Sequence, residues 1–256
     1  MEQQVAVVTG GAGGIGLAII RALVERDMNV IAVDRDARRL QSAMGTLTAD
    51  GSHVELVEAD VSRAVDAEAV IAETERGFGR VDFLVNAAGV LRPGRADQYS
   101  LDDWQTTFAV NAQGVFLMSQ AAVRRMIPRR RGAIVTVASN AAGVPRVGLA
   151  AYAASKAAAV TLTKVLGLET ARYGIRCNVV SPGSTDTSML RRLWTEADGA
   201  EAAVAGRPDQ YRVGIPLGRL AAPDDVAAAV AFLLSPQADH ITLHELTVDG
   251  GAALGA

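Results

Sequence analysis

Residues 5–20 read VAVVTGGAGGIGLAII and combine a strand pattern, a glycine-rich turn and the start of a helix. The first part, Val5 to Thr9, is short, apolar and β-branched, which predicts a buried strand. Five glycines follow within seven positions, and an apolar helical pattern runs from Ile15 to about Arg26. A strand, a glycine turn and a helix in this order are typical of the opening of a dinucleotide-binding fold.

The glycines in this turn allow the backbone to approach a pyrophosphate closely, and the helix N-terminus offers free N–H groups. They fit two dehydrogenase spacings, GxGxxG from Gly11 and GxxxGxG from Gly10, and the residues alone leave both frames open. The residues that we expect at the cofactor in this segment are Gly10, Gly14, Ile15 and Gly16.

The second predicted strand, residues 29–34, ends in Asp34, eighteen residues after Gly16. A carboxylate at this place can accept hydrogen bonds from the adenosine ribose, and it would repel the 2′-phosphate of NADP. The sequence therefore favours NAD as the cofactor. Arg35 follows at once and is able to pair with a phosphate, so NADP stays open as the alternative.

Strand and helix patterns alternate along the chain, which predicts a parallel sheet with helices on both faces. We expect one Rossmann-type, doubly wound α/β domain over residues 1–256, since no linker or internal repeat divides the chain. The predicted strands are 5–9, 29–34, 53–58, 81–86, 133–138, 175–181 and 241–248. The predicted helices are 14–27, 37–49, 64–78, 101–127, 151–173 and 223–235.

One segment, residues 187–214, departs from this alternation. It is polar and alanine-rich, and it follows the turn Ser181-Pro182-Gly183. A segment of this kind at the carboxyl edge of a sheet is expected to form a lid over the substrate, and an ordinary surface excursion is the alternative.

The composition excludes several classes of partner. The formal charge is −3 without a long basic block, so nucleic acid is not an expected partner. No apolar run is long enough to span a membrane and no signal peptide opens the chain, which predicts a cytoplasmic protein. The single Cys177 excludes an internal disulfide, and His53, His240 and His244 do not cluster with other ligands, so no metal site is expected.

Tyr152 and Lys156 lie four residues apart, which puts both side chains on one face of a helix. An ammonium beside a phenol favours the phenolate, so we expect the pKa of Tyr152 to fall below its usual value. Such a phenol can exchange a proton with an alcohol. Ser139, at the end of an apolar strand, is placed to hold the reacting oxygen.

These motifs, together with Asn86-Ala87-Ala88-Gly89, Asn111 and Pro182-Gly183, stand in an order that resembles the short-chain dehydrogenase/reductase family over essentially the whole chain. The resemblance implies a nicotinamide cofactor, a homotetramer and a catalytic set in which Asn111 holds a water in a proton relay to Lys156. It also implies that Tyr152 and Lys156 contact the cofactor. The further cofactor-contacting positions that it implies are Asp60, Val61, Asn86, Ala87, Gly89, Pro182, Gly183, Thr185 and Thr187.

From about Val81 onward, stretches such as GAIVTVASNAAGVPR and RCNVVSPGSTDT resemble the family's dehydrogenases of cyclohexadiene diol acids, which form a catechol acid for siderophores. The implied substrate is a small cyclic carboxylic acid bound by Ser139 and Tyr152. Arg146, between these two residues, is the first candidate for its carboxylate. Weaker candidates for the carboxylate are Arg92, Arg191, Arg192 and Arg212, and Gln210 is a candidate for a hydroxyl.

Other functions remain open at this point. The substrate could carry an amine in place of one hydroxyl, or be a 3-oxoacyl compound or a sugar alcohol, and no residue separates these. A non-catalytic NAD-binding protein on the same fold is opposed by the intact set of Asn111, Ser139, Tyr152 and Lys156.

Overall fold

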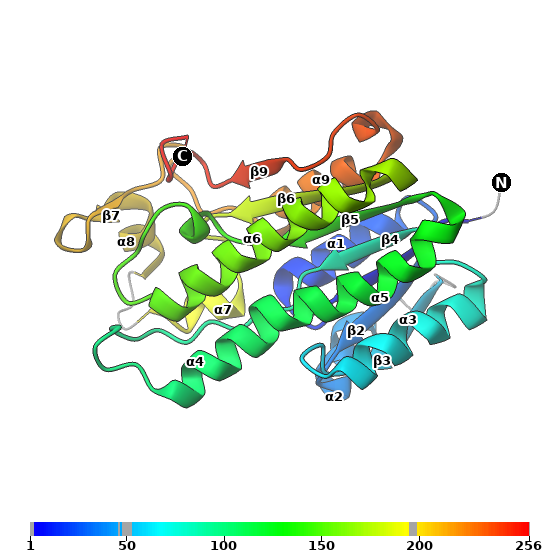
Figure 1. Cartoon of the computed structure of the whole chain (residues 1–256). Helices are drawn as coiled ribbons and strands as arrows, with labels where there is room; N and C mark the ends of the chain where they lie inside the picture. Colours follow the sequence, from blue (N-terminus) through cyan, green and yellow to red (C-terminus); the bar gives the residue numbers. More distant parts are fainter. Residues whose placement is uncertain (1–2, 46, 48–52, 195–198, 256) are drawn as a thin grey trace.

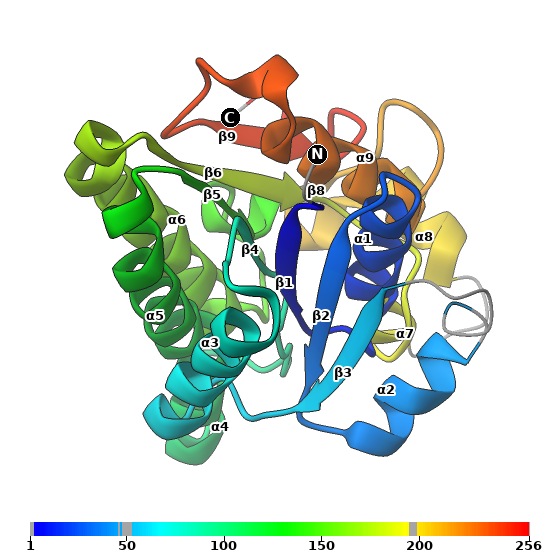
Figure 2. The same ribbon diagram turned by 90° about the vertical axis from the view of Figure 1, so that its right-hand side faces the viewer.

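A computed structural model describes residues 3–45, 47, 53–194 and 199–255. Seven parallel strands form one sheet in the order β3-β2-β1-β4-β5-β6-β9 (Figures 1 and 2). The predicted doubly wound sheet of about seven strands is therefore confirmed. The strands are β1 Val5–Thr9, β2 Asn29–Asp34, β3 Val54–Glu58, β4 Phe83–Asn86, β5 Gly132–Val137, β6 Ile175–Pro182 and β9 Glu245–Val248.

Helices cover both faces of this sheet, with α3, α5 and α6 on one side and α1, α2 and α9 on the other (Figure 2). The carboxyl ends of the strands point to the end of the molecule where α7 and α8 lie (Figure 1). The helices are α1 Gly14–Val24, α2 Ala37–Met44, α3 Ala64–Phe78, α4 Leu101–Phe108, α5 Gly114–Arg129, α6 Ala150–Thr170, α7 Ser188–Arg191, α8 Gly199–Ala205 and α9 Pro223–Leu234.

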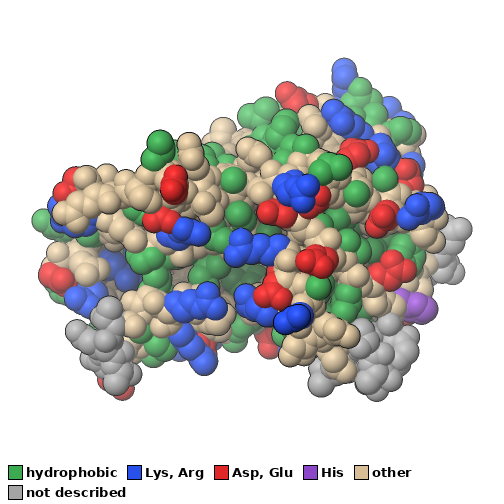
Figure 3. Space-filling model, turned by 90° about the horizontal axis from the view of Figure 1, so that it is seen from below, with side chains coloured by type: hydrophobic (Ala, Val, Ile, Leu, Met, Phe, Trp, Pro, Cys, Tyr) green, Lys and Arg blue, Asp and Glu red, His purple; other side chains and the backbone are tan. Residues whose placement is uncertain are grey.

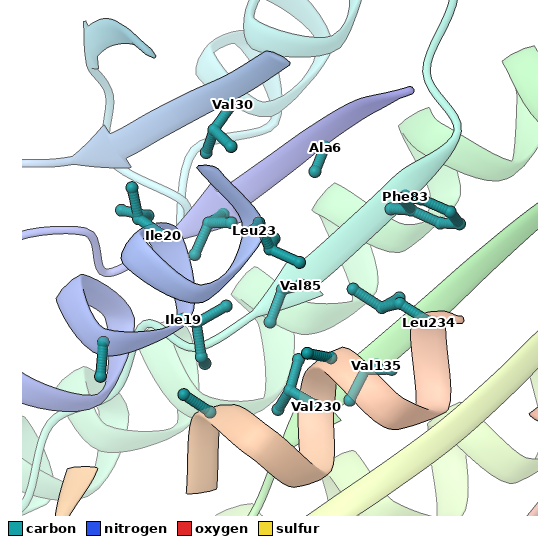
Figure 4. Packing of buried hydrophobic residues seen from close by; sticks show 14 of the residues in the cluster. Ala6, Ile19, Ile20, Leu23, Val30, Phe83, Val85, Val135, Val230 and Leu234 are labelled. Atoms are coloured by element: carbon teal, nitrogen blue, oxygen red, sulfur yellow. The ribbon is translucent and has the colours of Figure 1, made fainter. Parts of the chain in front are cut away.

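The core consists of two apolar layers, one on each face of the sheet. Along β1, Val5 and Val7 face the layer under α3 and α5, whereas Ala6 and Val8 face the layer under α1 and α9. Strands that are buried on both faces read as continuous apolar runs, which explains why β1 has no polar alternation. Figure 4 shows side chains of α1, such as Leu23, packed with those of the neighbouring strands and α9.

The helix predicted at 101–127 is interrupted. A π-helical segment, Ala109–Gln113, separates α4 from α5 and contains the buried Asn111. Single π turns of this kind often occur at functional sites, because they change the direction in which one residue points.

Other boundaries also differ from the prediction. The last strand begins at Glu245 and not at residue 241, because Asn178 pairs with the preceding backbone: its amide donates to Ile241 O and accepts from His244 N. The first helix ends at Val24, and Asp27 beyond it has a φ of 59°. The second ends at Met44, and part of its predicted range, 46 and 48–49, lies outside the described residues.

The segment 187–214 is more structured than a polar excursion. It contains α7, α8 and an antiparallel pair of two-residue strands, β7 Gly206–Arg207 and β8 Arg212–Val213. Residues 195–198 lie outside the described part. Its role as a lid stays a prediction. Within the described ranges, every helix is too short or too polar to cross a bilayer.

Candidate active site

A cavity of about 410 Å³ lies at the carboxyl ends of β1, β2 and β4, where the strand order reverses direction. Ligands of open α/β sheets bind at such a reversal. Seen from below, the molecule has a hollow on this side with basic side chains around it (Figure 3). The predicted cofactor residues on the cavity lining are Gly10, Gly14, Ile15, Gly16, Asp34, Arg35, Asp60, Val61, Ala87, Gly89 and Thr187.

Two positions of the glycine turn have no room for a side chain, so only glycine allows the close packing seen there. Gly10 has a φ of +71°, and a Cβ there would lie 2.7 Å from Ala88 Cα. A Cβ on Gly16 would lie 2.1 Å from Gly10 O, so α1 packs directly on the turn. Thr9 ties the turn to the strand beside it, because its hydroxyl accepts hydrogen bonds from Ala87 N and Ala88 N, each at 3.1 Å.

The carboxylate of Asp34 is held in one orientation at the cavity. One oxygen accepts from Ala12 N and the other from Asp36 N, both at 3.1 Å. Since both N–H groups belong to the backbone, the carboxylate cannot turn away from a ligand without losing both bonds. A fixed acid at this place fits a ribose diol and repels a 2′-phosphate.

A second acid, Asp60, lies farther along the same wall. Burial raises its pKa, but hydrogen bonds from Ser62 and the positive charges of Arg35 and Arg63 outweigh this effect and lower the pKa below its ordinary value. Asp60 therefore remains ionised. Arg35 lines the cavity and acts on this carboxylate through its charge, and Arg39, which sequence reasoning did not single out, also lines the cavity.

Several predicted cofactor residues do not lie on this lining. Asn86 is buried behind the cavity, and its amide donates to Ser119 Oγ at 2.9 Å, so it braces the sheet. Thr185 is buried, and its hydroxyl donates to Gly183 O at 3.2 Å. The predicted residues outside the lining are Asn86, Tyr152, Lys156, Pro182, Gly183 and Thr185.

Lys156 is buried in α6 next to the cavity wall. Its ammonium donates to Val137 O at 2.9 Å, and a Cβ on Gly89 would lie 3.4 Å from its Nζ. Burial lowers the pKa of Lys156 to about 8. This lysine therefore exchanges a proton readily near neutral pH, directly beside the lining residue Gly89.

The hydroxyl groups of Tyr152 and Ser139 lie near each other. Burial raises the pKa of Tyr152, and the interaction with Ser139 offsets the rise only in part. The expected fall in this pKa is therefore wrong for the protein chain alone. The physical reason is that Lys156 gives its hydrogen bond to Val137 O, with its Nζ 5.9 Å from the centre of the Tyr152 ring.

The side-chain amide of Asn111 makes all its hydrogen bonds to other parts of the protein. Its oxygen accepts from Val90 N at 2.9 Å, and its NH₂ group donates to Val90 O at 2.9 Å and to Ser155 Oγ at 3.0 Å. An amide has two donor hydrogens, so both are committed. The side chain thus fixes the π-helical segment between the loop after β4 and α6, and the proton relay stays a prediction.

The predicted substrate-binding residues Arg92, Arg146 and Gln210 lie in different surroundings. Arg92 lines the cavity, but its guanidinium pairs with Asp103 on α4. Arg146 lies in the loop between Asn140–Ala142 and α6, half-buried, and Gln210 lies in the turn between β7 and β8. Neither of the last two belongs to the cavity lining.

Sequence reasoning missed part of the wall opposite the glycine turn. This part comes from α7 and the residues just after it, within the segment predicted as a lid, where no periodic pattern marks a helix of four residues. Thr187, which was predicted, caps this helix by accepting from Leu190 N at 3.3 Å. The additional lining residues are Ser188, Met189 and Leu193, and Arg192, a weaker candidate for the substrate carboxylate, lines the same wall.

Known proteins resemble this chain in sequence. A family model described as short chain dehydrogenase matches residues 4–198. The 2,3-dihydro-2,3-dihydroxybenzoate dehydrogenase of Bacillus subtilis is 50% identical, over 100% of this chain and 98% of that protein. The Escherichia coli protein of the same name is 46% identical, over 97% and 96%.

A solved structure adds a likeness in three dimensions. The 3-ketoacyl-(acyl-carrier-protein) reductase from Brucella melitensis, complexed with NADH, superposes with a TM-score of 0.86. It is 33% identical to this chain, and the match covers 98% of this chain and 99% of that one.

Proposed function

The chain belongs to the short-chain dehydrogenase family, and from that membership we propose that it oxidises 2,3-dihydro-2,3-dihydroxybenzoate to 2,3-dihydroxybenzoate with NAD, in catechol siderophore biosynthesis. The observation that carries the proposal is the cluster of Tyr152, Ser139 and Lys156 beside the cavity wall at Gly89. Relatives that carry the name of this reaction are 50% and 46% identical over nearly the full length, which supports this substrate.

The residues of the cavity fit an NAD molecule. Its adenosine ribose would meet the fixed carboxylate of Asp34, and its pyrophosphate would lie on the glycine turn, where Gly10 and Gly16 leave room for it. When bound, NAD accepts the hydride and, in its oxidised form, brings a positively charged nicotinamide ring.

Proton transfer falls to this chain's own residues. Tyr152, as phenolate, takes the proton of the ring C3 hydroxyl while hydride leaves C3, and Ser139 holds the same oxygen by a hydrogen bond. The immediate product is a ketone in a dienone ring, and its tautomerisation to a catechol gains aromatic stability. The protein therefore has to orient the ring and supply one proton acceptor.

Lys156 restores the acceptor between turnovers. With a pKa of about 8 it can take a proton from the neighbourhood of Tyr152 and release it near neutral pH. Asn111 acts as a positioning residue, because its side chain holds Ser155 and, through it, the turn of α6 that carries Tyr152. The release of that proton to solvent through a water beside Asn111 is part of the same proposal.

The carboxylate of the substrate calls for a cation, and Arg146 is the first candidate because it lies in the loop that joins the Ser139 and Tyr152 segments. Arg92 is a weaker candidate since it is paired with Asp103. Gln210 is a candidate for a ring hydroxyl. The segment 187–214 serves as the substrate lid in this proposal.

We also propose that the protein is a cytoplasmic homotetramer. The family resemblance implies the tetramer, and exposed apolar side chains along α4, α5 and α6 give it a contact surface. They are Leu101, Trp104, Phe116, Val165 and Leu168.

The test is a turnover assay with purified protein. We expect NADH formation with the dihydrodiol acid and recovery of the catechol acid as product. The analogue with an amine in place of one hydroxyl, a 3-hydroxyacyl thioester and a sugar alcohol are assayed beside it. A higher kcat/KM with one of these compounds than with the dihydrodiol acid would overturn the proposed substrate.

A further inference from the structure

Two half-buried cations from separate segments of the chain lie at the carboxyl end of the sheet, and the charge of one acts on the other. Arg146 belongs to the loop before α6, and Arg212 begins β8 of the short hairpin after α8. Burial and the positive charge of Arg212 lower the pKa of Arg146. Two half-buried guanidinium groups that repel each other are unfavourable unless a negative charge binds between them.

The nearest acid does not neutralise this pair. Asp249 acts on Arg146 through its charge only. Its carboxylate accepts hydrogen bonds from Asn140 Nδ2 at 3.0 Å, Gly251 N at 2.9 Å and Ala253 N at 2.8 Å. Within the described ranges, neither Arg146 nor Arg212 forms an ion pair with an acid.

Arg212 also has a hydrogen-bond donor without a partner. Its Nε is buried and finds no hydrogen-bond acceptor among the residues that the structure describes. A buried donor without a partner is costly, above all on a charged group. The planar guanidinium presents its N–H groups in a fork that matches the two oxygens of a carboxylate.

Asp249 links the two arginines to the reacting groups. It holds Asn140, the residue next to Ser139, and it also faces Arg146. The segment that follows the hairpin is fastened to the same place, because Leu217 N donates to Gly250 O at 3.1 Å. The hairpin and the loop before α6 lie at the same end of the sheet (Figure 1).

We propose that Arg146 and Arg212 together bind the carboxylate of the substrate, so that the hairpin supplies the second half of a carboxylate clamp whose first half lies beside Ser139. This inference rests on the proposed function and deepens it. It assigns a role to Arg212 and predicts that a ring acid is preferred over an uncharged ring alcohol.

The test compares the dihydrodiol acid with its methyl ester, which has the same ring and the same reacting hydroxyl. For the unaltered protein we expect a higher kcat/KM with the acid. In Arg212→Gln, and likewise in Arg146→Gln, kcat/KM for the acid should fall about ten- to a hundredfold, mainly through KM, as expected for a lost charge-assisted hydrogen bond. The ester and the KM for NAD should change less than about twofold.

Arg219→Gln is the matched control, because it removes a positive charge from the connection after the hairpin at an exposed residue that pairs with Asp225. Its acid-to-ester ratio should stay that of the unaltered protein. Arg212→Lys should recover part of the preference, since it restores the charge but not the fork, and it replaces Arg212→Gln if that variant does not fold.

Equal losses for acid and ester in the Arg212 variants would overturn the clamp, and so would an unaltered protein that oxidises both compounds equally well. If the unaltered protein oxidises neither compound, the proposed function fails and the clamp fails with it. The two failures are therefore distinguishable.

Discussion

The ammonium nitrogen of Lys156 lies 5.9 Å from the centre of the Tyr152 ring, yet it donates its hydrogen bond to the Val137 carbonyl. The two groups are neighbours, but each is shifted by burial toward its uncharged form: the pKa of Lys156 falls to about 8 and that of Tyr152 rises. The chain thus holds an acid and a base whose ionised forms are both suppressed. This has consequences for stability and for the pH dependence of the reaction.

Lys156→Met should stabilise the protein against unfolding below pH 8. The folded-state pKa is about 8 against 10.5 for an ordinary lysine, so the folded protein bears a cost for the buried charge of up to about 3 kcal/mol at low pH. Between pH 8 and 10.5 the unfolded chain retains a proton that the folded one has lost, so the unfolding free energy of the parent rises with pH relative to the variant.

Urea denaturation of cofactor-free protein at several pH values checks this. The advantage of Lys156→Met over the parent should shrink as pH rises through the interval from 8 to 10.5, and other titrating groups cancel in the difference. A difference that does not change with pH would mean that the lysine keeps its ordinary pKa in the folded protein.

Tyr152→Phe should lower kcat about 10²–10⁴-fold, the usual contribution of a positioned acid or base. The loss of the hydroxyl leaves the cavity residues unchanged, so NAD binding measured by fluorescence or calorimetry should persist. Full turnover by this variant would exclude Tyr152 as the proton acceptor.

The parent's oxidation rate should rise with pH from neutral toward alkaline conditions. Burial raises the pKa of Tyr152 above its ordinary value in the protein chain, so the phenolate is the minor form at neutral pH. The profile of kcat/KM with saturating NAD measures this rise. A flat profile would mean that the acceptor is already ionised at neutral pH and that bound cofactor overcomes the effect of burial.

Asp34→Ser should shift the cofactor preference from NAD toward NADP. The substitution removes the fixed negative charge, while Arg35 and Arg39 already line the same cavity and can pair with a 2′-phosphate. We expect kcat/KM for NAD to fall about ten- to a hundredfold and that for NADP to rise.

The control is Asp36→Ser, which removes a negative charge two residues away. Asp36 caps α2 by accepting from Arg39 N at 3.0 Å, and serine can keep this cap. Its NAD preference should match that of the parent. Equal shifts in both variants would show that overall charge, rather than the orientation of Asp34, sets the preference.

The sequence was sufficient for the strand–helix alternation because each element carries its own periodic signal. The five residues of β1 and the pattern of α1 follow from apolar spacing and glycine placement alone. The break at Ala109–Gln113 could not be read, because a π turn depends on the bonds of Asn111 to Val90 and Ser155, which are distant in sequence.

For the candidate site, too, the sequence predicted the local motifs but not the contacts between distant segments. Residues in the glycine turn are local and were found, whereas the direction of the Tyr152 pKa shift depends on burial and on the hydrogen bond from Lys156 to Val137 O. Similarly, the interaction of Arg146 with Arg212 depends on where the chain after the hairpin is held, by the bond from Leu217 N to Gly250 O. Such contacts follow from tertiary packing, which periodicity does not report.

The glycine turn itself gives the sharpest steric prediction. Gly16→Ala should abolish NAD binding, because its Cβ would lie 2.1 Å from Gly10 O and 2.8 Å from Gly10 C, both backbone atoms that cannot move independently. The turn and the first residues of α1 must shift apart, which removes the N–H groups from the pyrophosphate. Calorimetric titration with NAD measures the loss, and unfolding experiments report a destabilisation of about 1–3 kcal/mol, typical of overpacking.

Gly77→Ala is the matched control for the same substitution in another helix. Gly77 lies in α3, where an added Cβ would meet no atom within 4 Å. Alanine there should stabilise the protein by about 0.5–1 kcal/mol, because it lowers the entropy of the unfolded chain and favours the helix. NAD affinity should not change. If Gly16→Ala bound NAD as tightly as Gly77→Ala does, the close contact between α1 and Gly10 would not be required for the cofactor site.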